Sequence, residues 1–483
     1  MGANNTSKNI ESKSSKADIH ENHWGSYTGS FLSKNPRLAN NVNKLRMLTA
    51  SMSGCISSDI PIQIILKNRE VGHRPCIRTS KGYFDAPENP SGPFLPCDRA
   101  SIVNRYLPNR KTIIEKIESK TFCCLYLPGR KLVTASQDDK LRLYIRDENL
   151  MHKYKLVNNS SVPDVGWSII DLATNSDGTQ IACSAWSESS KFSSRFSQST
   201  IFKYFYFNGI FRFAYFSLRY TMDDLRLIAG GSDGYIYIFS HVHPQLQLFQ
   251  AHEGDVNAIH CMSQDPNIFC SGGDDGLCKV WDIRILPSKA PVGVFAGHRH
   301  GITYIDGHGN GKYILTNSKD QTVKIWDLRK FSSSYAEKQT LRATQRQTWD
   351  YRYQDVPRFF NLAKPMKIIP FFLPPIYCIK GDGSLMTFRG HSVRHTLIRA
   401  KFSPERTGFR YVYCGSTEGT LYIFDILTGE YVRMLSGHKS VVRDCCWHPE
   451  ENEIVTVAWD GCTMRWYCDM SPEYALELER DSD

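Results

Sequence analysis

Two consecutive stretches of the chain repeat one alternation of apolar and polar positions. Residues 251–284 contain AHEGDVNAIHC and then IFCSGGDDGLCKVWDIR, and residues 297–329 contain GHRHGITYIDG and then YILTNSKDQTVKIWDLR. In each copy a turn with histidine precedes an apolar strand, a strand of small residues, a tight turn with aspartate and an alternating strand that ends in Trp-Asp. A repeat of about 40–45 residues with this order of strands predicts a four-stranded propeller blade.

Weaker versions of the same pattern predict five more blades, which makes seven in all. These five stretches are residues 122–146, 167–189, 225–239, 391–425 and 438–467. We expect residues 112–117 to form a lone strand that completes the last blade, because pairing the two ends closes the ring and covers the sheet edges. The Trp-Asp endings resemble those of the WD40 family. The prediction is an all-β fold, a seven-bladed WD40 β-propeller over residues 111–468.

Two regions interrupt the blade pattern. Residues 192–220 are dense in aromatic side chains (FKYFYFNGIFRFAYF), and residues 330–390 form an insertion between the fifth and sixth blades with an apolar run, MKIIPFFLPPIYCI. Binding lids are one interpretation of such insertions. We favour lineage-specific loops or translated non-coding sequence for the aromatic runs, within residues 192–220 and 365–380.

The regions that flank the propeller differ from it in composition. Residues 1–35 are rich in Ser, Asn and Lys and poor in apolar side chains, which predicts a disordered N-terminal tail. Residues 36–110 are expected to form an extended arm with one short helix. Four apolar residues with helical spacing indicate that helix: Leu38, Val42, Leu45 and Leu48. Residues 469–483 form an acidic C-terminal tail that is expected to be loose.

The N-terminal sequence also fits the N-myristoylation pattern. It begins Met-Gly-Ala-Asn-Asn-Thr, so Gly2 would carry the acyl chain, and several lysines follow. The pattern is short, and we favour an unmodified tail. Because a single acyl chain binds membranes only marginally, no stable membrane association is expected.

Composition narrows the class of protein. The chain has 483 residues, 41% hydrophobic and 12% aromatic, so it can bury a large core. Its 15 cysteines are an odd number without a C-x-x-C pair, which favours a reduced protein of the nucleus and cytoplasm. Neither a secretory signal nor an apolar run of membrane-spanning length is found in the sequence. The net charge of +10 permits acidic partners without naming one, and no nucleic acid is expected.

A histidine, a hydroxyl and an aspartate recur together, as they do in hydrolase triads. The trio returns in several blades, always beside a tryptophan, and this repetition argues against catalysis because one active site suffices. The resemblance to WD40 proteins implies a structural hydrogen-bond network instead. Its residues are His252, Ser271, Asp275 and Trp281; His298, Thr316, Asp320 and Trp326; and His438, Thr456, Asp460 and Trp466. In the sixth blade Cys414 replaces the hydroxyl and Glu418 the aspartate, so we expect a looser blade.

The sequence shows no motif of a nucleotide- or metal-dependent enzyme. It has no P-loop, no H-E-x-x-H and no cysteine or histidine spacing of a zinc site. We therefore expect no catalytic residue, no cofactor and no bound metal.

One arginine stands two positions after each of the two clear Trp-Asp pairs. Arg284 follows Asp282 and Arg329 follows Asp327, which places both arginines near the rim of one propeller face. A planar, always-charged guanidinium with several donors suits an interface anchor. The string WDYR at 349–352 lies in the insertion without a strand or turn aspartate before it, so we do not count it as a blade ending.

Two W-D-x-R endings in consecutive blades resemble the substrate receptors of cullin-4 RING ubiquitin ligases. Longer runs are similar to the family of WD-repeat protein twenty-three, the eleventh cullin-4-associated factor, over about residues 106–467 outside the aromatic-dense stretches. Those runs include NSKDQTVKIWDLRKFSS, TQRQTWDYRYQDVP and SLMTFRGHSVRHTLIRAKFSP.

This resemblance implies a non-catalytic receptor. Arg284 and Arg329, with Asp282 and Asp327 supporting their backbone, would bind the ligase adaptor and through it the cullin and RING subunits. The helix expected near residues 35–53 would add a second contact. The opposite face and the central channel would hold the substrate protein, whose lysines then meet the charged ubiquitin-conjugating enzyme through effective concentration.

Two other functions stay open on the residues alone. A scaffold or peptide reader of a chromatin or RNA complex would use the same fold without a ligase, and both rim arginines would then be dispensable. An RNA-binding propeller would need a continuous basic and aromatic groove, for which Arg394, Arg399 and Lys401 are the candidate cations.

Overall fold

Antiparallel strands are the main secondary structure of the chain that the computed structural model describes. The described residues are 36–53, 78–79, 82–83, 96–147, 153–163, 165–187, 201–202, 213–240, 246–288, 290–357 and 379–469. Several predictions concern residues outside these ranges: the disordered tail 1–35 with Gly2, most of the acidic tail, and most of both aromatic runs. No described helix is long and apolar enough to cross a membrane.

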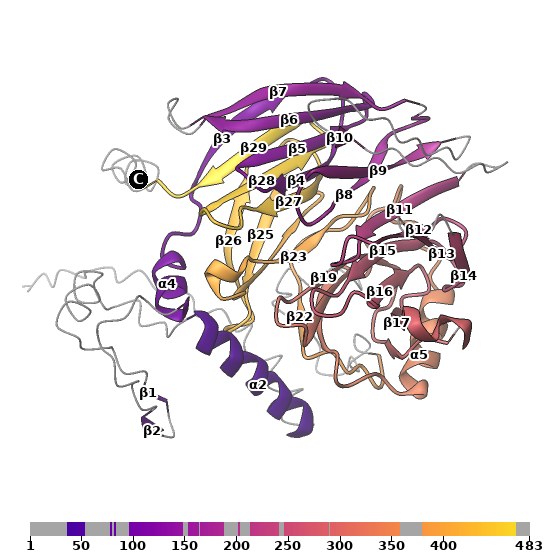
Figure 1. Cartoon of the computed structure of the whole chain (residues 1–483). Helices are drawn as coiled ribbons and strands as arrows, with labels where there is room; N and C mark the ends of the chain where they lie inside the picture. The colour runs from indigo at the N-terminus through magenta and orange to yellow at the C-terminus, as the bar shows by residue number, and fades with distance from the viewer. Residues whose placement is uncertain are drawn as a thin grey trace, which may run out of the picture.

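Six sheets stand around one axis (Figure 1). Five of them have four antiparallel strands each, and the strands of each sheet are named in order from the inner to the outer one. They are β4 (Thr121–Leu127), β5 (Lys131–Ser136), β6 (Lys140–Asp147) and β7 (Lys153–Ser161); β15 (Val256–Cys261), β16 (Ile268–Gly273), β17 (Cys278–Asp282) and β18 (Gly293–Phe295); β19 (Ile302–Gly307), β20 (Tyr313–Ser318), β21 (Thr322–Asp327) and β22 (Met386–Phe388); β23 (Ala400–Phe402), β24 (Tyr411–Gly415), β25 (Thr420–Asp425) and β26 (Tyr431–Ser436); β27 (Val442–Trp447), β28 (Glu453–Ala458), β29 (Cys462–Tyr467) and β3 (Arg110–Lys116).

The sixth sheet has seven strands and corrects the predicted count of seven separate blades. Its strands are β8 (Ile169–Thr174), β9 (Gln180–Ser187), β10 (Ile201–Phe202), β11 (Phe213–Tyr220), β12 (Arg226–Gly231), β13 (Tyr235–Ser240) and β14 (Leu246–Gln250). Strand β9 pairs with β8 and also with β11, where Ala214 stands opposite Trp186. This pairing joins the second and third expected blades into one sheet.

The inner strands nevertheless form a closed ring. Strands β4, β8, β11, β15, β19, β23 and β27 follow one another around the axis, and β27 lies against β4. The closure depends on β3, which pairs with β29 so that Lys116 stands opposite Cys462. This register confirms the prediction that an N-terminal strand completes the last sheet, and it leaves no open gap between the two ends of the ring.

Both interrupting regions contribute strands that the pattern did not predict. Strand β11 belongs to the inner ring, with Ala214 and Leu218 fully buried, although it lies in the stretch that we interpreted as a loop. The 330–390 insertion stands inside a sheet rather than between two blades, because β22 pairs with β21 as the fourth strand. Between them the chain forms α5 (Ser334–Gln345), capped by Ser333, whose side chain accepts a hydrogen bond from the Ala336 N–H.

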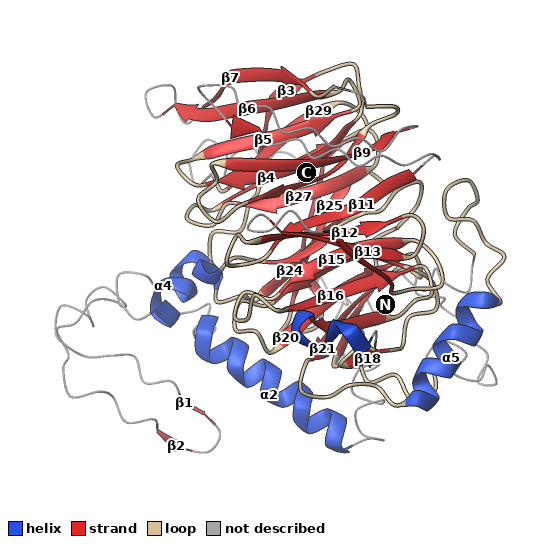
Figure 2. Ribbon diagram, turned by 45° about the vertical axis from the view of Figure 1, so that its right-hand side comes forward, coloured by secondary structure: helices blue, strands red, loops and turns tan. Residues whose placement is uncertain are grey.

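The described residues of the arm before the propeller contain two helices, where one was expected. Helix α2 (Pro36–Ser53) covers the stretch with helical spacing, and α4 (Pro96–Val103) follows the two-residue strands β1 (Arg78–Thr79) and β2 (Gly82–Tyr83). Val42 and Leu45 of α2 are buried in a cluster with side chains of the β19–β22 and β23–β26 sheets. Figure 2 shows α2 and α4 on one side of the stacked strands and α5 on the other.

Candidate functional site

The loops of the ring define two faces. We call the arginine face the one that carries the loops between the first and second strands of each sheet and the ends of the third strands. Arg284 follows β17 and Arg329 follows β21, so both side chains belong to this face. Two short 3₁₀ helices also lie on this face: η1 (Ile283–Ser288) follows β17, and η2 (Glu405–Thr407) lies between β23 and β24. The opposite face carries the turns between second and third strands and the segments that lead into each inner strand.

Each of the two arginines is held by the aspartate two positions before it. In Arg284 the Nε atom donates to Asp282 Oδ1 at 2.9 Å and Nη2 donates to Oδ2 at 2.7 Å. In Arg329 the corresponding distances to Asp327 are 2.8 and 2.9 Å. The backbone N–H of each arginine also donates to the same carboxylate. The guanidinium is thus fixed along one edge.

The other edge of each guanidinium faces solvent. The side chains of Arg284 and Arg329 are 57% and 54% exposed, and Nη1 of each makes no hydrogen bond to a described residue. The hydrogen bonds that Arg284 donates to Asp282 lower the pKa of that carboxyl. An arginine that is already oriented loses less side-chain entropy when it binds an acceptor on a partner.

Helix α2 extends the same face from Arg329. The Arg329 guanidinium lies against Tyr313, with 3.2 Å between Nη2 and the phenol oxygen. Tyr313 belongs to the buried cluster that also holds Val42 and Leu45 of α2. On its outer side α2 exposes Met47, which is 68% accessible. Arg329 and α2 therefore lie close to each other on this face.

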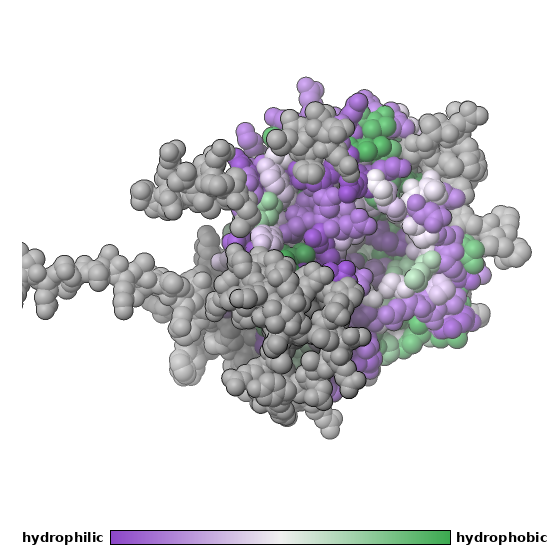
Figure 3. All heavy atoms as spheres, turned by 60° about the vertical axis from the view of Figure 1, so that its left-hand side comes forward, coloured by the Kyte–Doolittle hydropathy of each residue, from purple (hydrophilic) through white to green (hydrophobic). Residues whose placement is uncertain are grey.

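Hydrophilic side chains dominate the described surface on the side of the molecule where α4 lies in Figure 1. Figure 3 brings that side forward and shows mostly hydrophilic atoms, with only small separate areas of hydrophobic ones. The described part of this side therefore shows no large apolar patch in that view.

The WDYR string at 349–352 forms the same pair on the opposite face. Arg352 donates from Nε and Nη2 to Asp350 at 3.0 and 2.8 Å. The segment is fixed by His395, whose backbone N–H donates to the Tyr351 carbonyl at 2.9 Å, and by Lys319, whose Nζ lies 4.4 Å from the Tyr351 ring centroid. The local sequence alone is enough to form the Asp–Arg pair. The fold determines on which face of the propeller the pair lies.

The recurring trio forms hydrogen-bonded sets within three sheets. His252 Nδ1 lies 2.9 Å from Asp275, its Nε2 lies 2.7 Å from Ser271, and the Trp281 N–H donates to the same hydroxyl at 2.8 Å. The sets His298–Asp320–Thr316–Trp326 and His438–Asp460–Thr456–Trp466 repeat this geometry. Each set links a turn, the second strand and the third strand of a sheet, and the histidine and hydroxyl residues of all three sets are buried.

The sheet β23–β26 lacks this set. His391 turns its Nε2 toward Asn317 Oδ1 of the neighbouring sheet at 3.0 Å, while its Nδ1 is buried without a partner. Cys414 is fully buried at the hydroxyl position, and Glu418 is exposed. His391 therefore connects two neighbouring sheets and does not link strands within its own sheet.

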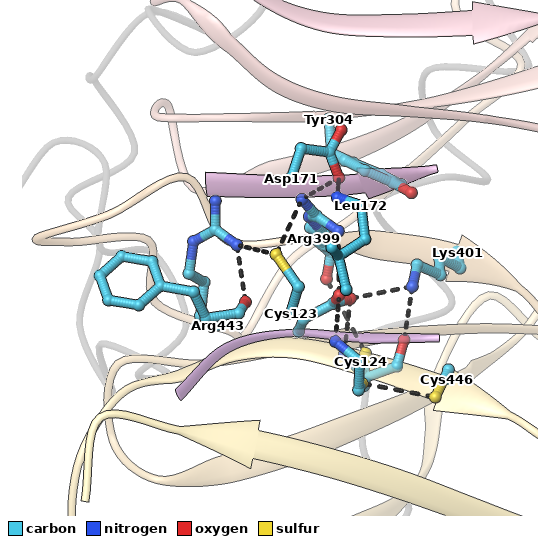
Figure 4. Close-up of polar contacts among 12 residues, drawn as sticks. Cys123, Cys124, Asp171, Leu172, Tyr304, Arg399, Lys401, Arg443 and Cys446 are labelled. Atoms are coloured by element: carbon cyan, nitrogen blue, oxygen red, sulfur yellow. Dashed lines mark hydrogen bonds and ion pairs between the residues drawn. The ribbon is translucent and has the colours of Figure 1, made fainter. Parts of the chain in front are cut away.

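A charged cluster at the axis was not predicted (Figure 4). Arg399 pairs with Asp171 at 2.6 Å and with Asp444 at 2.9 Å, and Lys401 Nζ lies 2.8 Å from Asp444. Burial raises the pKa of Asp444, but Arg399 and Lys401 outweigh it and lower that pKa to about 2. Arg443, 2% exposed, donates to the carbonyls of Phe122 and Ile170 in two other strands of the ring.

Two of the three cations considered for an RNA-binding groove belong to this cluster. Arg399 is buried and Lys401 is 14% exposed, and each is paired with a carboxylate. The only signal in the sequence was a charged residue in the middle of an otherwise apolar inner strand, as in SIIDLAT and VVRDCCW. Among the described residues, no group of three His, Cys, Asp or Glu side chains is arranged to hold a metal ion.

Comparison with known proteins identifies the repeat and the family. The WD40 family (WD domain, G-beta repeat) matches residues 244–282, 289–327 and 429–466. The "DDB1- and CUL4-associated factor 11 homolog" of Caenorhabditis elegans is 39% identical over 77% of this chain and 65% of its own length, and that of Caenorhabditis briggsae is 37% identical over 79% and 70%. The "LEC14B protein" of Lithospermum erythrorhizon is 33% identical over 78% of each chain. The chain therefore belongs to the WD40-repeat family of the DDB1- and CUL4-associated factor 11 homologs.

Proposed function

We propose that this chain is a non-catalytic substrate receptor of a cullin-4 RING ubiquitin ligase. The observation that carries the proposal is the pair Arg284 and Arg329, which are exposed on one face and held by aspartate in the same orientation. The relatives are named for association with DDB1 and CUL4, which supports the same partner for this chain. The chain spans 65% of the length of the C. elegans relative.

In this proposal the arginine face binds the adaptor. The free Nη1 edges of Arg284 and Arg329 donate to carbonyl or carboxylate oxygens of the adaptor surface. Helix α2 adds a second contact next to Arg329, with Met47 as an apolar anchor. The protein makes no covalent bond itself; it raises the concentration of substrate lysines near the conjugating enzyme.

We place the substrate on the opposite face and no longer in the channel. Arg399 spans the axis between inner strands that are not neighbours and is only 5% exposed. A peptide threaded through the channel would have to break these ion pairs, which costs several kcal/mol. The opposite face remains available, and it carries exposed side chains such as Tyr353 at 79%.

Affinity purification of the full chain tests the adaptor contact. The double variant Arg284→Ala/Arg329→Ala should fold as the wild type does and lose the adaptor, since it removes two exposed anchors. Arg352→Ala is the matched control, because this arginine has the same Asp–Arg geometry on the opposite face. If the double variant keeps the adaptor, the two arginines are ordinary strand endings and the scaffold function takes precedence.

A further inference from the structure

Residues 349–353 of the insertion present two side chains to solvent from an anchored backbone on the opposite face. Trp349 is buried, and the Tyr351 ring centroid lies 4.4 Å from Lys319 Nζ. The next two residues are exposed: the Arg352 side chain to 59% and Tyr353 to 79%. A side chain on an anchored backbone loses less conformational entropy when it binds a partner.

His395 holds this segment in place and is itself in an unfavourable backbone conformation. Its φ angle is +68°, in the left-handed region that residues other than glycine rarely adopt. Its backbone N–H donates to the Tyr351 carbonyl at 2.9 Å, and its Nδ1 donates to the Arg352 carbonyl at 2.8 Å. Backbone strain of this kind persists only where surrounding contacts maintain it, and it is concentrated at binding sites.

An aromatic row continues from His395 over the ends of four neighbouring sheets. The His395 ring centroid lies 6.5 Å from that of Trp459, in the turn between β28 and β29. Phe122, at the start of β4, lies 5.8 Å from Trp459 and 5.4 Å from Trp167, which precedes β8. Trp167 is 46% exposed, whereas Phe122 is buried. All four rings of the row belong to the opposite face.

Two cationic groups beside the aromatic row keep donors that no described residue uses. Lys120 Nζ lies 4.2 Å from the Trp459 ring centroid, and it makes no ion pair or hydrogen bond with a described residue. Arg352 uses Nε and Nη2 for Asp350, which leaves its Nη1 without a described partner. Such donors form their strongest hydrogen bonds with charged acceptors.

The carboxylates along the row decide what kind of acceptor fits. Most are engaged: Asp350 by Arg352, Asp355 by Arg394 at 2.7 Å, and Asp460 by His438 Nδ1 at 3.2 Å. Glu118 is exposed and forms no ion pair with Lys120. A nucleic acid carries one phosphate per nucleotide and would meet these carboxylates, because it needs a continuous series of cations. A peptide can place its carboxylates only where donors are available.

We infer that this surface binds an acidic segment of the substrate protein. One carboxylate of the segment accepts from Lys120 and another from Arg352 Nη1, and an aromatic or long apolar side chain packs on the rings between them. The inference deepens the proposed function and rests on it for the occupant, a substrate protein. It predicts a preference that neither the aromatic row nor the two cations would give alone.

A phage-displayed library of random peptides tests this preference. Peptides of about 12 residues reach about 40 Å when extended, which is enough to cross the row. Selection on the immobilised full chain should enrich peptides in which two carboxylates flank an aromatic or long apolar residue. The most enriched peptide, labelled with fluorescein, then gives an affinity by fluorescence anisotropy.

Variants of the two cations connect the selected peptide to this surface. Lys120→Met and Arg352→Met should each weaken its binding about tenfold, as for one charge-assisted hydrogen bond. Lys155→Met and Arg433→Met are the matched controls, because both residues are exposed on outer strands, and they should not change the affinity. Thermal melting shows that each variant is folded.

Adaptor binding by the same samples separates this inference from the ligase function. Lys120→Met and Arg352→Met should keep the adaptor, and a wild type without the adaptor would overturn only the ligase function. The inference is overturned if no peptide is enriched, if the enriched peptides lack carboxylates, or if both variants bind them as the wild type does. Tighter binding of a random-sequence single-stranded RNA, lost in the same variants, would overturn it in favour of nucleic acid.

Discussion

Arg399 and Asp171 form an ion pair with 2.6 Å between Nη2 and Oδ1, although their strands are not neighbours in the ring. Arg399 precedes β23, Asp171 lies in β8, and the strands β27 and β4 stand between them. The second partner of Arg399, Asp444, belongs to β27. One side chain therefore ties three inner strands together across the axis, in addition to the pairing of adjacent strands.

We expect Arg399→Met to lower the free energy of unfolding by about 3 kcal/mol, because it leaves Asp171 and Asp444 buried with one cation fewer. Arg219 and Lys401 still pair with these carboxylates, so we expect the variant to remain folded. Denaturant unfolding measures the change. The double variant Arg399→Met/Asp171→Asn should recover part of the loss; a single variant that unfolds at the wild-type midpoint would contradict the role of the pair.

We expect similar substitutions to lower the free energy of unfolding by different amounts in a sheet that has a hydrogen-bond set and in one that lacks it. Thr316→Val keeps the shape but leaves the Trp326 N–H and His298 Nε2 without the shared hydroxyl, so we expect a loss of about 2–4 kcal/mol in the free energy of unfolding. Cys414→Val occupies the same position in the β23–β26 sheet, where no such set forms, and should cost about 1 kcal/mol or less. Urea denaturation of the two variants side by side decides the point. Equal costs would mean that the set adds no stability.

The carboxyl of Asp255 should make the free energy of unfolding depend on pH in the direction opposite to that of a paired carboxylate. Burial and then the charge of Asp274 raise the pKa of Asp255 to about 6, against the opposing effects of Lys319 and Arg352. A carboxyl with a raised pKa in the folded state binds more protons there than in the unfolded chain. Its contribution to the free energy of unfolding therefore falls as the pH rises from about 4 to about 6.

Asp255→Asn should accordingly stabilise the protein at pH 7, by about 1 kcal/mol after allowance for partial exposure, and change little at pH 4. Denaturant unfolding at both pH values measures this difference. Asp177→Asn, at an exposed loop position, serves as the control and should show no pH-dependent gain. A gain of the same size at pH 4 would point to a cause other than ionisation.

The proposed adaptor contact should depend on the shape of the guanidinium and not only on its charge. Arg329→Lys keeps the charge but cannot form the two parallel bonds to Asp327, so we expect it to weaken adaptor binding almost as much as Arg329→Ala, by about tenfold. Surface plasmon resonance with purified adaptor measures both variants. Wild-type affinity in the lysine variant would show that a point charge is enough.

The sequence predicted those parts of the fold in which local pattern and tertiary contact agree. The strands that end at Asp282 and Asp327 were recognisable because each carries tryptophan, a small-residue strand and a turn aspartate within one repeat. The Asp–Arg pairs also follow from two-residue spacing. Where the chain departs from the repeat, as in β11, the strand is defined by its neighbours β9 and β12, and local sequence did not predict it.

The charged cluster at the axis could not be predicted for a related reason. Arg399 and Asp171 are held together only after the ring closes, since no short spacing relates them. To predict a contact between residues of different sheets, one must know the strand register of every sheet in the ring.

The pairing of β3 with β29 has a consequence for synthesis of the protein. The ribosome makes Arg110 early and Tyr467 late, so β3 waits for its partner strand until nearly all the described residues have been translated. A message cut short anywhere before β29 leaves two unpaired sheet edges on the nascent product, and such edges recruit chaperones or other chains. We therefore expect a product that lacks only the last strand to be removed or to aggregate, as if the whole protein had failed to fold.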